Sequence, residues 1–483
     1  MKETGNFSRR DLLKLFGMSA GASLAGQAAF PRKIRAQGST PKLLGTARNI
    51  VVIQNCGAMS PHEGLNFKET KFTAKDLEPQ KVNADFVLSR TLFPNYEAWA
   101  PYASLIRTFK GIGLIHFPAQ YHTQAGRAMN TAIVREIPAF GSVVAYELES
   151  QRKQTDTFPT YMSFDLDGAR CPPIGSGMLP PKFAGLNLST NTVFSTFGGG
   201  EESADSATNL SRRFETLNRM LEVSSVQNDE IGPKAEEYAA SYDYAIKMLL
   251  DPRFKKMLSV TEEEKKRYGS DKDVARAKFG SALLLARNAL ALDAGARFLW
   301  VSNSYNGGNG HFDVHDHMLD RTVPLNNGRQ CIYNSFPRFD KGLGSFITDL
   351  RSLPGHAPGK TLFDETLICV LVEFGRTPDM NPHDGRDHYI ENYTNMFMGG
   401  GVKPGRVFGK TDAIGAKVID NGWKFKEQPY MDHVTSTIYS ALGIDYNKKI
   451  HDTPSGREYE YQQTAPLGGP EFIPRTALDD LFV

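Results

Sequence analysis

The sequence contains the apolar run TLICVLV at residues 366–372, followed at once by EFGRTP at residues 373–378. A run of uncharged residues that is rich in β-branched side chains is typical of a strand buried on both faces. Such strands occur in parallel sheets that helices cover on both sides. The run therefore predicts a central strand of an α/β protein, with Glu373 as the first polar residue at its carboxyl end.

Strands of the same kind recur along the chain. Residues 49–54 (NIVVIQ) and 297–302 (RFLWVS) predict two further buried strands, and residues 103–108 predict a shorter one. The spacing of apolar residues predicts helices between and around these strands. The predicted helices cover about 96–102, 275–293, 336–350 and 433–442. This alternation predicts one three-layer α/β/α domain with a mainly parallel sheet, from about residue 40 to residue 450.

Two segments depart from this alternation. Residues 205–270 are polar with a helical pattern, and they predict a helical insertion or side layer of the domain. Residues 451–483 follow the last predicted helix and are expected to form a C-terminal tail.

The N-terminus has the pattern of an export signal. SRRDLLK at residues 8–14 precedes a weakly hydrophobic, Gly/Ala-rich stretch, which predicts a twin-arginine signal peptide over residues 1–36. An amphipathic surface helix is the alternative. We expect the twin-arginine translocase as a partner, and export of the folded chain to the periplasm or the cell exterior. No later stretch reaches about 18 apolar residues, so no transmembrane anchor is expected in the mature chain.

Charge and cysteine content narrow the possible partners. The 56 basic and 54 acidic residues give a net charge of +2, which does not indicate a nucleic-acid partner. The four cysteines have neither zinc-ribbon nor redox spacing. An oxidising compartment would allow a disulfide between Cys171 and Cys331.

A cluster of metal-binding residue types follows the predicted strand at 297–302. The stretch HFDVHDH at residues 311–317 holds three histidines and two aspartates. In open parallel sheets, ligands bind beyond the carboxyl ends of the strands. Imidazole and carboxylate together suit zinc, manganese, iron or nickel. The cluster favours a metal site, and the alternative is a polar loop whose histidines satisfy backbone groups.

Further candidates stand near other strand ends. Glu373 is either a site residue or the partner of Arg376 in an ion pair, and GRDH at residues 385–388 adds a second Asp-His pair. Ser60 follows the first strand and serves either a site or a helix cap. His122 is a candidate ligand or general base, with a purely structural histidine as the equal alternative.

These motifs together resemble a known bacterial family, exported by the twin-arginine route and called domain of unknown function fifteen-oh-one. Its sequences typically carry GGWDTH, EFGRTP and GRDH. This chain has GHFDVH at residues 310–315, EFGRTP at 373–378 and GRDH at 385–388, and it ends the domain on LGID at 442–445. The resemblance covers almost the whole predicted mature chain and implies a fold like that of the alkaline phosphatase and sulfatase superfamily.

The resemblance also implies a set of site residues. Asp313, His315, Glu373 and His388 stand where the superfamily places ligands of a divalent metal, here zinc, manganese or calcium. The remaining candidates are Ser60 and Thr123 as nucleophiles, His122 as a base, Arg376 or Arg386 as anion-binding groups, and Asp387 beside the ligands.

The chain departs from the superfamily pattern near the first strand. Glu63 and Asn66 stand where the family usually has aspartates, and Asn55-Cys56 stands where active phosphatases carry a metal-binding aspartate. Loss of a carboxylate weakens a two-metal site. Two functions therefore stay open: an exported metal-dependent hydrolase of phosphate or sulfate esters, or a non-catalytic binding or assembly protein with a degraded active site. The first would act on an anionic ester or polymer. A lyase or oxidoreductase is a third class.

The order of the elements makes one geometric prediction. One helix joins the strands at 297–302 and 366–372, so a right-handed crossover should place them side by side or nearly so. We therefore expect Asp313, His315, Glu373 and His388 to lie together in space.

Overall fold

The computed structural model describes residues 33–34, 41–197, 247–270, 278–304, 312–322, 331–424, 427–462 and 476–482. Nearly all of the predicted signal peptide lies outside the described residues, as do His311 and most of the predicted insertion at 205–270.

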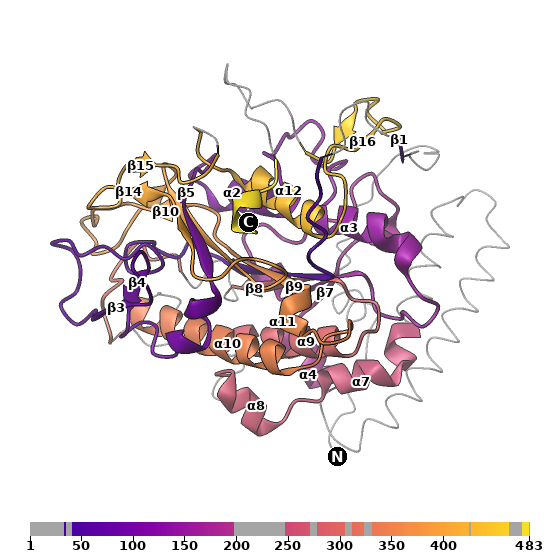
Figure 1. Ribbon diagram of the computed structural model, residues 1–483, viewed down its shortest axis with the longest axis horizontal. Helices are drawn as coiled ribbons and strands as arrows, with labels where there is room; N and C mark the ends of the chain where they lie inside the picture. Colours follow the sequence, from indigo (N-terminus) through magenta and orange to yellow (C-terminus); the bar gives the residue numbers. More distant parts are fainter. Residues whose placement is uncertain are drawn as a thin grey trace, which may run out of the picture.

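An eight-stranded sheet forms the centre of the described part of the chain, in the order β13-β5-β12-β9-β2-β8-β6-β7 (Figure 1). β12 is antiparallel to both neighbours and all other adjacent pairs are parallel, which confirms a mainly parallel sheet. The strands are β2 Asn49–Asn55, β5 Ser104–Phe109, β6 Tyr161–Phe164, β7 Leu186–Leu188, β8 Phe298–Asn303, β9 Thr366–Leu371, β12 Tyr393–Met398 and β13 Val407–Phe408.

The central strands end level with one another. Asn55 pairs with Asn303 on one side of β2, and Gln54 pairs with Leu371 on the other. β2 lies between β8 and β9, so the two strands predicted to be side by side or nearly so are separated by one strand. The loops that follow β8 and β9 therefore leave the sheet at the same edge.

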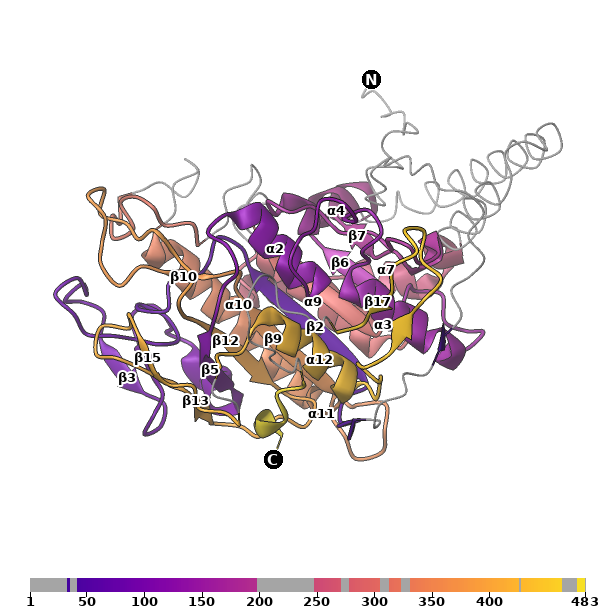
Figure 2. The same cartoon turned by 90° about the horizontal axis from the view of Figure 1, so that it is seen from above.

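Helices cover both faces of the sheet, which completes the predicted three layers (Figures 1 and 2). The helices α4, α7, α8, α9, α10 and α11 lie on one face, and α2, α3 and α12 lie on the other. Their bounds are α2 His116–Ala125, α3 Phe140–Leu148, α4 Thr190–Phe197, α7 Pro252–Leu258, α8 Glu262–Arg267, α9 Lys278–Ala291, α10 Ile332–Ser352, α11 Leu362–Glu365 and α12 Met431–Ala441. Within the described residues, no helix has the length and apolar character needed to cross a membrane.

Short ribbons decorate the main sheet. Three of them have two strands: β3 Pro79–Lys81 with β4 Val87–Ser89, β10 Gly375–Arg376 with β11 His388–Tyr389, and β14 Lys410–Thr411 with β15 Val418–Asp420. A fourth has three strands, with β16 Lys449–Ile450 between β1 Lys33–Ile34 and β17 Tyr459–Glu460.

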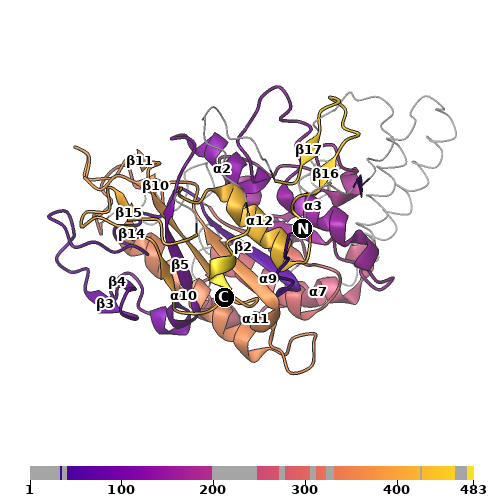
Figure 3. The same ribbon diagram turned by 45° about the horizontal axis from the view of Figure 1, so that its top comes forward.

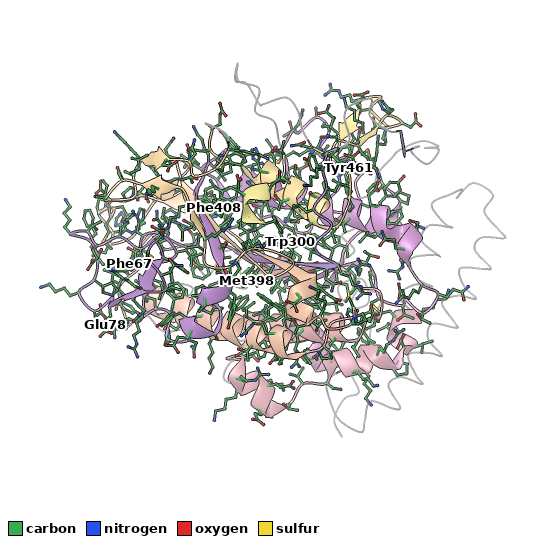
Figure 4. All side chains as sticks on the ribbon, in the orientation of Figure 1. Phe67, Glu78, Trp300, Met398, Phe408 and Tyr461 are labelled. Carbon is green, nitrogen blue, oxygen red and sulfur yellow. The ribbon has the colours of Figure 1, made fainter. Side chains whose placement is uncertain are left out.

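The core is centred on Trp300 of β8, which Figure 4 shows in the middle of the molecule. The indole is fully buried and packs on Phe140 of α3, with a distance of 5.5 Å between ring centroids. Its Nε1 donates a hydrogen bond of 3.1 Å to Gln54 Oε1 on the neighbouring strand. The buried polar atom of a central aromatic residue is thus satisfied within the sheet itself.

One sequence expectation needs correction, and one possibility that the sequence left open is decided. The helix expected over 96–102 is instead a pair of 3₁₀ turns, Tyr96–Ala98 and Ala100–Tyr102. Pro101 lies within the second turn and cannot continue an α-helix from the first, because it lacks an N–H and its ring clashes with the preceding turn. Cys171 and Cys331 are free thiols, so no disulfide joins them.

An ion-pair network fixes the side helices to the core. Asp349 of α10 accepts hydrogen bonds from Arg267 at 2.8 Å, Tyr268 at 2.7 Å and Arg287 at 2.9 Å. These donors belong to α8, the residue after it, and α9. One carboxylate therefore joins three helical segments.

We expect Asp349→Ala to lower the free energy of unfolding by about 3 kcal/mol, because the mutation leaves the buried hydroxyl of Tyr268 and the largely buried guanidinium of Arg287 without their acceptor. Urea unfolding followed by circular dichroism measures the change. Glu262→Ala is the control, since its pair with Lys265 is at the surface and should contribute less than about 1 kcal/mol. Equal effects of the two mutations would contradict this role for Asp349.

Candidate metal centre

Four side chains from separate segments meet beyond the carboxyl edge of the sheet. They are His116, Asp313, His315 and His388, and one donor atom from each lies within 4.8 Å of the other three. His116 begins α2, His388 lies on β11, and the two others come from the segment that follows β8. Figure 3 shows α2 and the β10–β11 ribbon at the same side of the molecule.

Asp313 Oδ1 is the common point of the cluster. It lies 3.2 Å from His116 Nε2, 3.2 Å from His315 Nε2 and 3.7 Å from His388 Nε2. The Nε2 atoms of His315 and His388 are themselves 2.8 Å apart. Three imidazole nitrogens and one carboxylate oxygen thus face a shared volume.

The opposite nitrogen of each ring is held by an acceptor outside the cluster. His116 Nδ1 lies 2.9 Å from Glu373 Oε1, and His315 Nδ1 lies 3.0 Å from Asp387 Oδ1. His388 Nδ1 donates to the carbonyl oxygen of Leu114 at 2.6 Å. Because these acceptors fix the proton on Nδ1, the Nε2 lone pair of each neutral ring points inward.

This arrangement fits a metal ion. The Nε2 atoms of His315 and His388 are 2.8 Å apart, and Arg376 Nη1 lies 3.2 Å from the first of them; a cation bound between the two nitrogens would stabilise this close approach of their lone pairs. Three imidazoles and a carboxylate form a donor set that zinc prefers, and outer acceptors on Nδ1 are the usual companions of metal-binding histidines. The residues present therefore match the group that the motif resemblance implies.

The side chains of the cluster shift one another's pKa values. Burial alone would lower the pKa of His116, but hydrogen bonds to Asp313 and Glu373 raise it to about 9. Burial would raise the pKa of Asp313, yet hydrogen bonds from three histidines and the charge of Arg376 hold it well below its usual range. A metal that binds here must displace the proton of His116, so its affinity depends on pH.

Glu373 is not one of the four clustered residues but contacts one of them, His116. Its Oε1 accepts from Gly57 N at 2.8 Å, Gln120 Nε2 at 3.0 Å and His116 Nδ1. Burial opposes ionisation, but the hydrogen bond and charge of His116 lower the pKa of Glu373. Glu373, which was predicted as a ligand, therefore contacts His116 of the cluster and is not itself a member. Asp387 has the corresponding place beside His315.

Both candidate anion-binding arginines are engaged within the protein. Arg376 is fully buried and donates to Asp313 Oδ1 at 2.6 Å and to backbone carbonyls, and its Nη1 lies 3.2 Å from His315 Nε2. Arg386 donates two hydrogen bonds to Glu63 Oε1, at 3.0 and 2.6 Å. Arg376 and His388 are cross-strand partners in the β10–β11 ribbon, so this ribbon sets the positions of both residues together.

The other predicted residues make their hydrogen bonds elsewhere. Ser60 Oγ donates to Glu63, and Thr123 Oγ1 donates to the carbonyl oxygen of Ala119 at 3.0 Å. His122 Nε2 lies 2.8 Å from Asp432 Oδ2. In the HFDVHDH stretch, His317 is exposed and contributes nothing to the four-residue cluster.

His116 is not among the site residues predicted from the sequence. The residue follows β5 after the glycine-containing segment GIGLI at residues 111–115 and begins a helix, so it lies beyond a strand end. The rule that ligands bind beyond the carboxyl ends of parallel strands, which pointed to the 311–317 stretch, therefore also applied to His116.

Comparison with known proteins yields one family. The model of the family described as protein of unknown function (DUF1501) matches residues 47–466. No curated protein matches the chain.

Several solved structures share its chain path at low identity. The lipoteichoic acid synthase LtaP from Listeria monocytogenes is 8% identical, with 88% of this chain and 78% of that chain covered and a TM-score of 0.38. The PsFucS1 sulfatase from Pseudoalteromonas sp. is 10% identical, with 82% and 68% covered and a TM-score of 0.38. A protein in the alkaline phosphatase superfamily from Vibrio parahaemolyticus is 10% identical, with 91% and 76% covered and a TM-score of 0.36. The likeness concerns the fold alone.

Gly385 sets the distance between the two loops that carry His315 and His388. A Cβ at position 385 would lie 2.1 Å from the backbone carbonyl carbon of His315. We expect Gly385→Ala to force the loops apart and to lower the free energy of unfolding by about 2 kcal/mol. Thermal or urea unfolding measures the loss. Gly175→Ala is the control, because a Cβ there meets nothing within 4 Å. A Gly385→Ala protein as stable as this control would refute the steric account.

Proposed function

We propose that this chain, which belongs to the DUF1501 family of proteins of unknown function, is an exported metal-dependent hydrolase of phosphate or sulfate esters. The observation that carries the proposal is the convergence of three histidines and one aspartate on a shared volume. The resemblance of the EFGRTP and GRDH motifs to the alkaline phosphatase and sulfatase pattern supports the ester class. The SRRDLLK motif at residues 8–14 supports folded export by the twin-arginine translocase to the periplasm or the cell exterior.

His116, Asp313, His315 and His388 would hold the ion. Three nitrogen donors favour zinc, or manganese, over calcium, which takes oxygen ligands. A bound divalent ion polarises an ester oxygen and lowers the pKa of a water molecule. The site opens to solvent at His315, whose side chain is 41% exposed, so an anionic ester can approach from that side.

The surrounding residues position the ligands. Glu373 and Asp387 fix the rings of His116 and His315 through Nδ1, and Arg376 fixes the carboxylate of Asp313. Arg386 neutralises Glu63 in a buried pair. We assign both arginines to this positioning role, because their donors are directed to carboxylates, carbonyls and, for Arg376, the Nε2 of His315.

Water is the nucleophile that we favour. The hydroxyl groups of Ser60 and Thr123 donate to Glu63 and to the carbonyl oxygen of Ala119. Neither hydrogen bond leads to the cluster, so attack by either hydroxyl would need a rearrangement of the buried site. A water molecule reaches the cluster from the exposed side of His315 without one.

One observation favours a non-catalytic binding protein as the second candidate. At the end of β2, Asn55 accepts a hydrogen bond from Asn303, and burial raises the pKa of the Cys56 thiol beyond its usual range. Neither residue supplies a carboxylate for a second ion. Within the described residues, only one group of side chains could hold a metal ion. A fold with one such group also suits a binding or assembly protein.

Metal content is the first test. We expect the purified chain to bind one zinc ion per molecule and His116→Ala to lose it, because a ring that supplies one of four donors is gone. Elemental analysis after dialysis measures the stoichiometry. His317→Ala is the control, since this exposed histidine of the neighbouring loop is not in the cluster. Equal metal content in all three proteins would contradict the assignment.

Turnover is the second test. A panel of aryl phosphates and aryl sulfates, assayed with zinc, manganese and calcium, should show hydrolysis with zinc or manganese. His116→Ala should abolish it. A folded, metal-loaded protein that hydrolyses no member of the panel would support the binding protein instead.

The roles of Glu373 and Asp313 can be separated. Glu373→Gln should retain one zinc ion but weaken its binding by about 10- to 100-fold, because the acceptor of a ligand is altered and the ligand remains. Asp313→Asn should lose stoichiometric zinc, because a donor atom of the cluster loses its charge. Competition with a fluorescent chelator measures both affinities. Loss of zinc from Glu373→Gln alone would make Glu373 the ligand.

A further inference from the structure

Exposed apolar side chains gather beside the metal centre. Seven large apolar residues are exposed in the described part of the chain, and four of them fall within six positions. These four are Ile112 at 39% exposure, Leu114 at 50%, Ile115 at 67% and Phe117 at 43%. We call residues 112–117 the apolar rim. Concentration of exposed apolar surface in one segment marks a binding site more often than scattered single residues do.

The rim is part of the same segment as the metal centre. His116, one of the four clustered side chains, lies between Ile115 and Phe117. The carbonyl oxygen of Leu114 is the acceptor that fixes His388 Nδ1. A molecule whose charged group lies at the cluster therefore meets the rim within one or two residues of the ligands.

The rim is also fixed in place at its base. Lys110 N donates to the carbonyl oxygen of Pro429 at 2.9 Å, and Gly111 N donates to that of Ile390 at 2.8 Å. At its other end the segment enters α2. A surface that is ordered before binding loses less conformational entropy when a ligand arrives.

We propose that the apolar rim binds the alkyl or aryl part of an amphiphilic anionic ester whose charged group lies at the metal centre. This inference rests on the proposed function and names the substrate class of the same site. A membrane surface is the less suitable occupant. Interfacial membrane segments combine apolar residues with lysine or arginine. Residues 111–118 (GIGLIHFP) contain neither, and the adjacent Lys110 is paired with Glu391 at 3.9 Å.

Ligand binding tests the proposal without turnover. The full-length, zinc-loaded chain is titrated by calorimetry with methylphosphonate and with octylphosphonate, which share a head group and are not hydrolysed. We expect octylphosphonate to bind at least about tenfold more tightly, because part of its chain is removed from water on the rim. In Ile115→Ser, and independently in Leu114→Ser, this ratio should fall towards one.

The chain offers a matched control. Ile419 lies on β15 and is 66% exposed, against 67% for Ile115, so Ile419→Ser removes the same side chain from an equally exposed position. This variant should keep the wild-type ratio of affinities.

The outcomes separate the two proposals. A ratio near one in the wild type, a ratio unchanged by both rim variants, or no binding of either phosphonate overturns the rim assignment. Binding of neutral lipid vesicles that depends on Ile115, without a preference for octylphosphonate, also overturns it in favour of a membrane surface. A rim-dependent preference in a protein that hydrolyses no ester supports the rim and contradicts only the hydrolase.

Discussion

The outward hydrogen bonds of His116, His315 and His388 are the constraint on which the site depends. Each ring is fixed at Nδ1 by an acceptor from another part of the chain: Glu373 after β9, Asp387 before β11, and the carbonyl oxygen of Leu114. A ring held in this way directs Nε2 to the opposite side. The three Nε2 atoms consequently converge on Asp313, and the donor set arises from the folded backbone and not from any one motif.

The parallel register of the sheet makes this convergence possible. Because β2, β8 and β9 end level, the segments that follow β8 and β9 start from one edge. The short β10–β11 ribbon then returns His388 to that edge opposite Arg376, and the missing side chain of Gly385 lets the ribbon approach His315 closely. A fold whose strands ended at different heights could not bring these residues together.

The sequence predicted the layers and part of the site for separate physical reasons. Continuous apolar runs such as 366–372 identify strands buried on both faces. Position at a strand end indicated Asp313, His315 and Glu373, and the family resemblance added His388. A sequence pattern cannot distinguish a member of the cluster from a residue that hydrogen-bonds to a member. For this reason Glu373 was expected in the cluster, whereas it contacts the Nδ1 of His116 from outside the cluster. That distinction depends on about 3 Å in the placement of a side chain. The prediction of a helix over 96–102 was wrong, because it relied on apolar spacing and did not take account of Pro101, which cannot continue an α-helix.

X-ray absorption spectroscopy of the zinc-loaded protein tests the central claim most directly, since it reports the atoms that surround the ion. Our account predicts a first shell of nitrogen and oxygen at about 2.0–2.2 Å, with the outer-shell scattering of three imidazole rings. In Glu373→Gln the same three rings should remain. A shell that contains sulfur, or that lacks imidazole scattering, would contradict a centre built from His116, Asp313, His315 and His388.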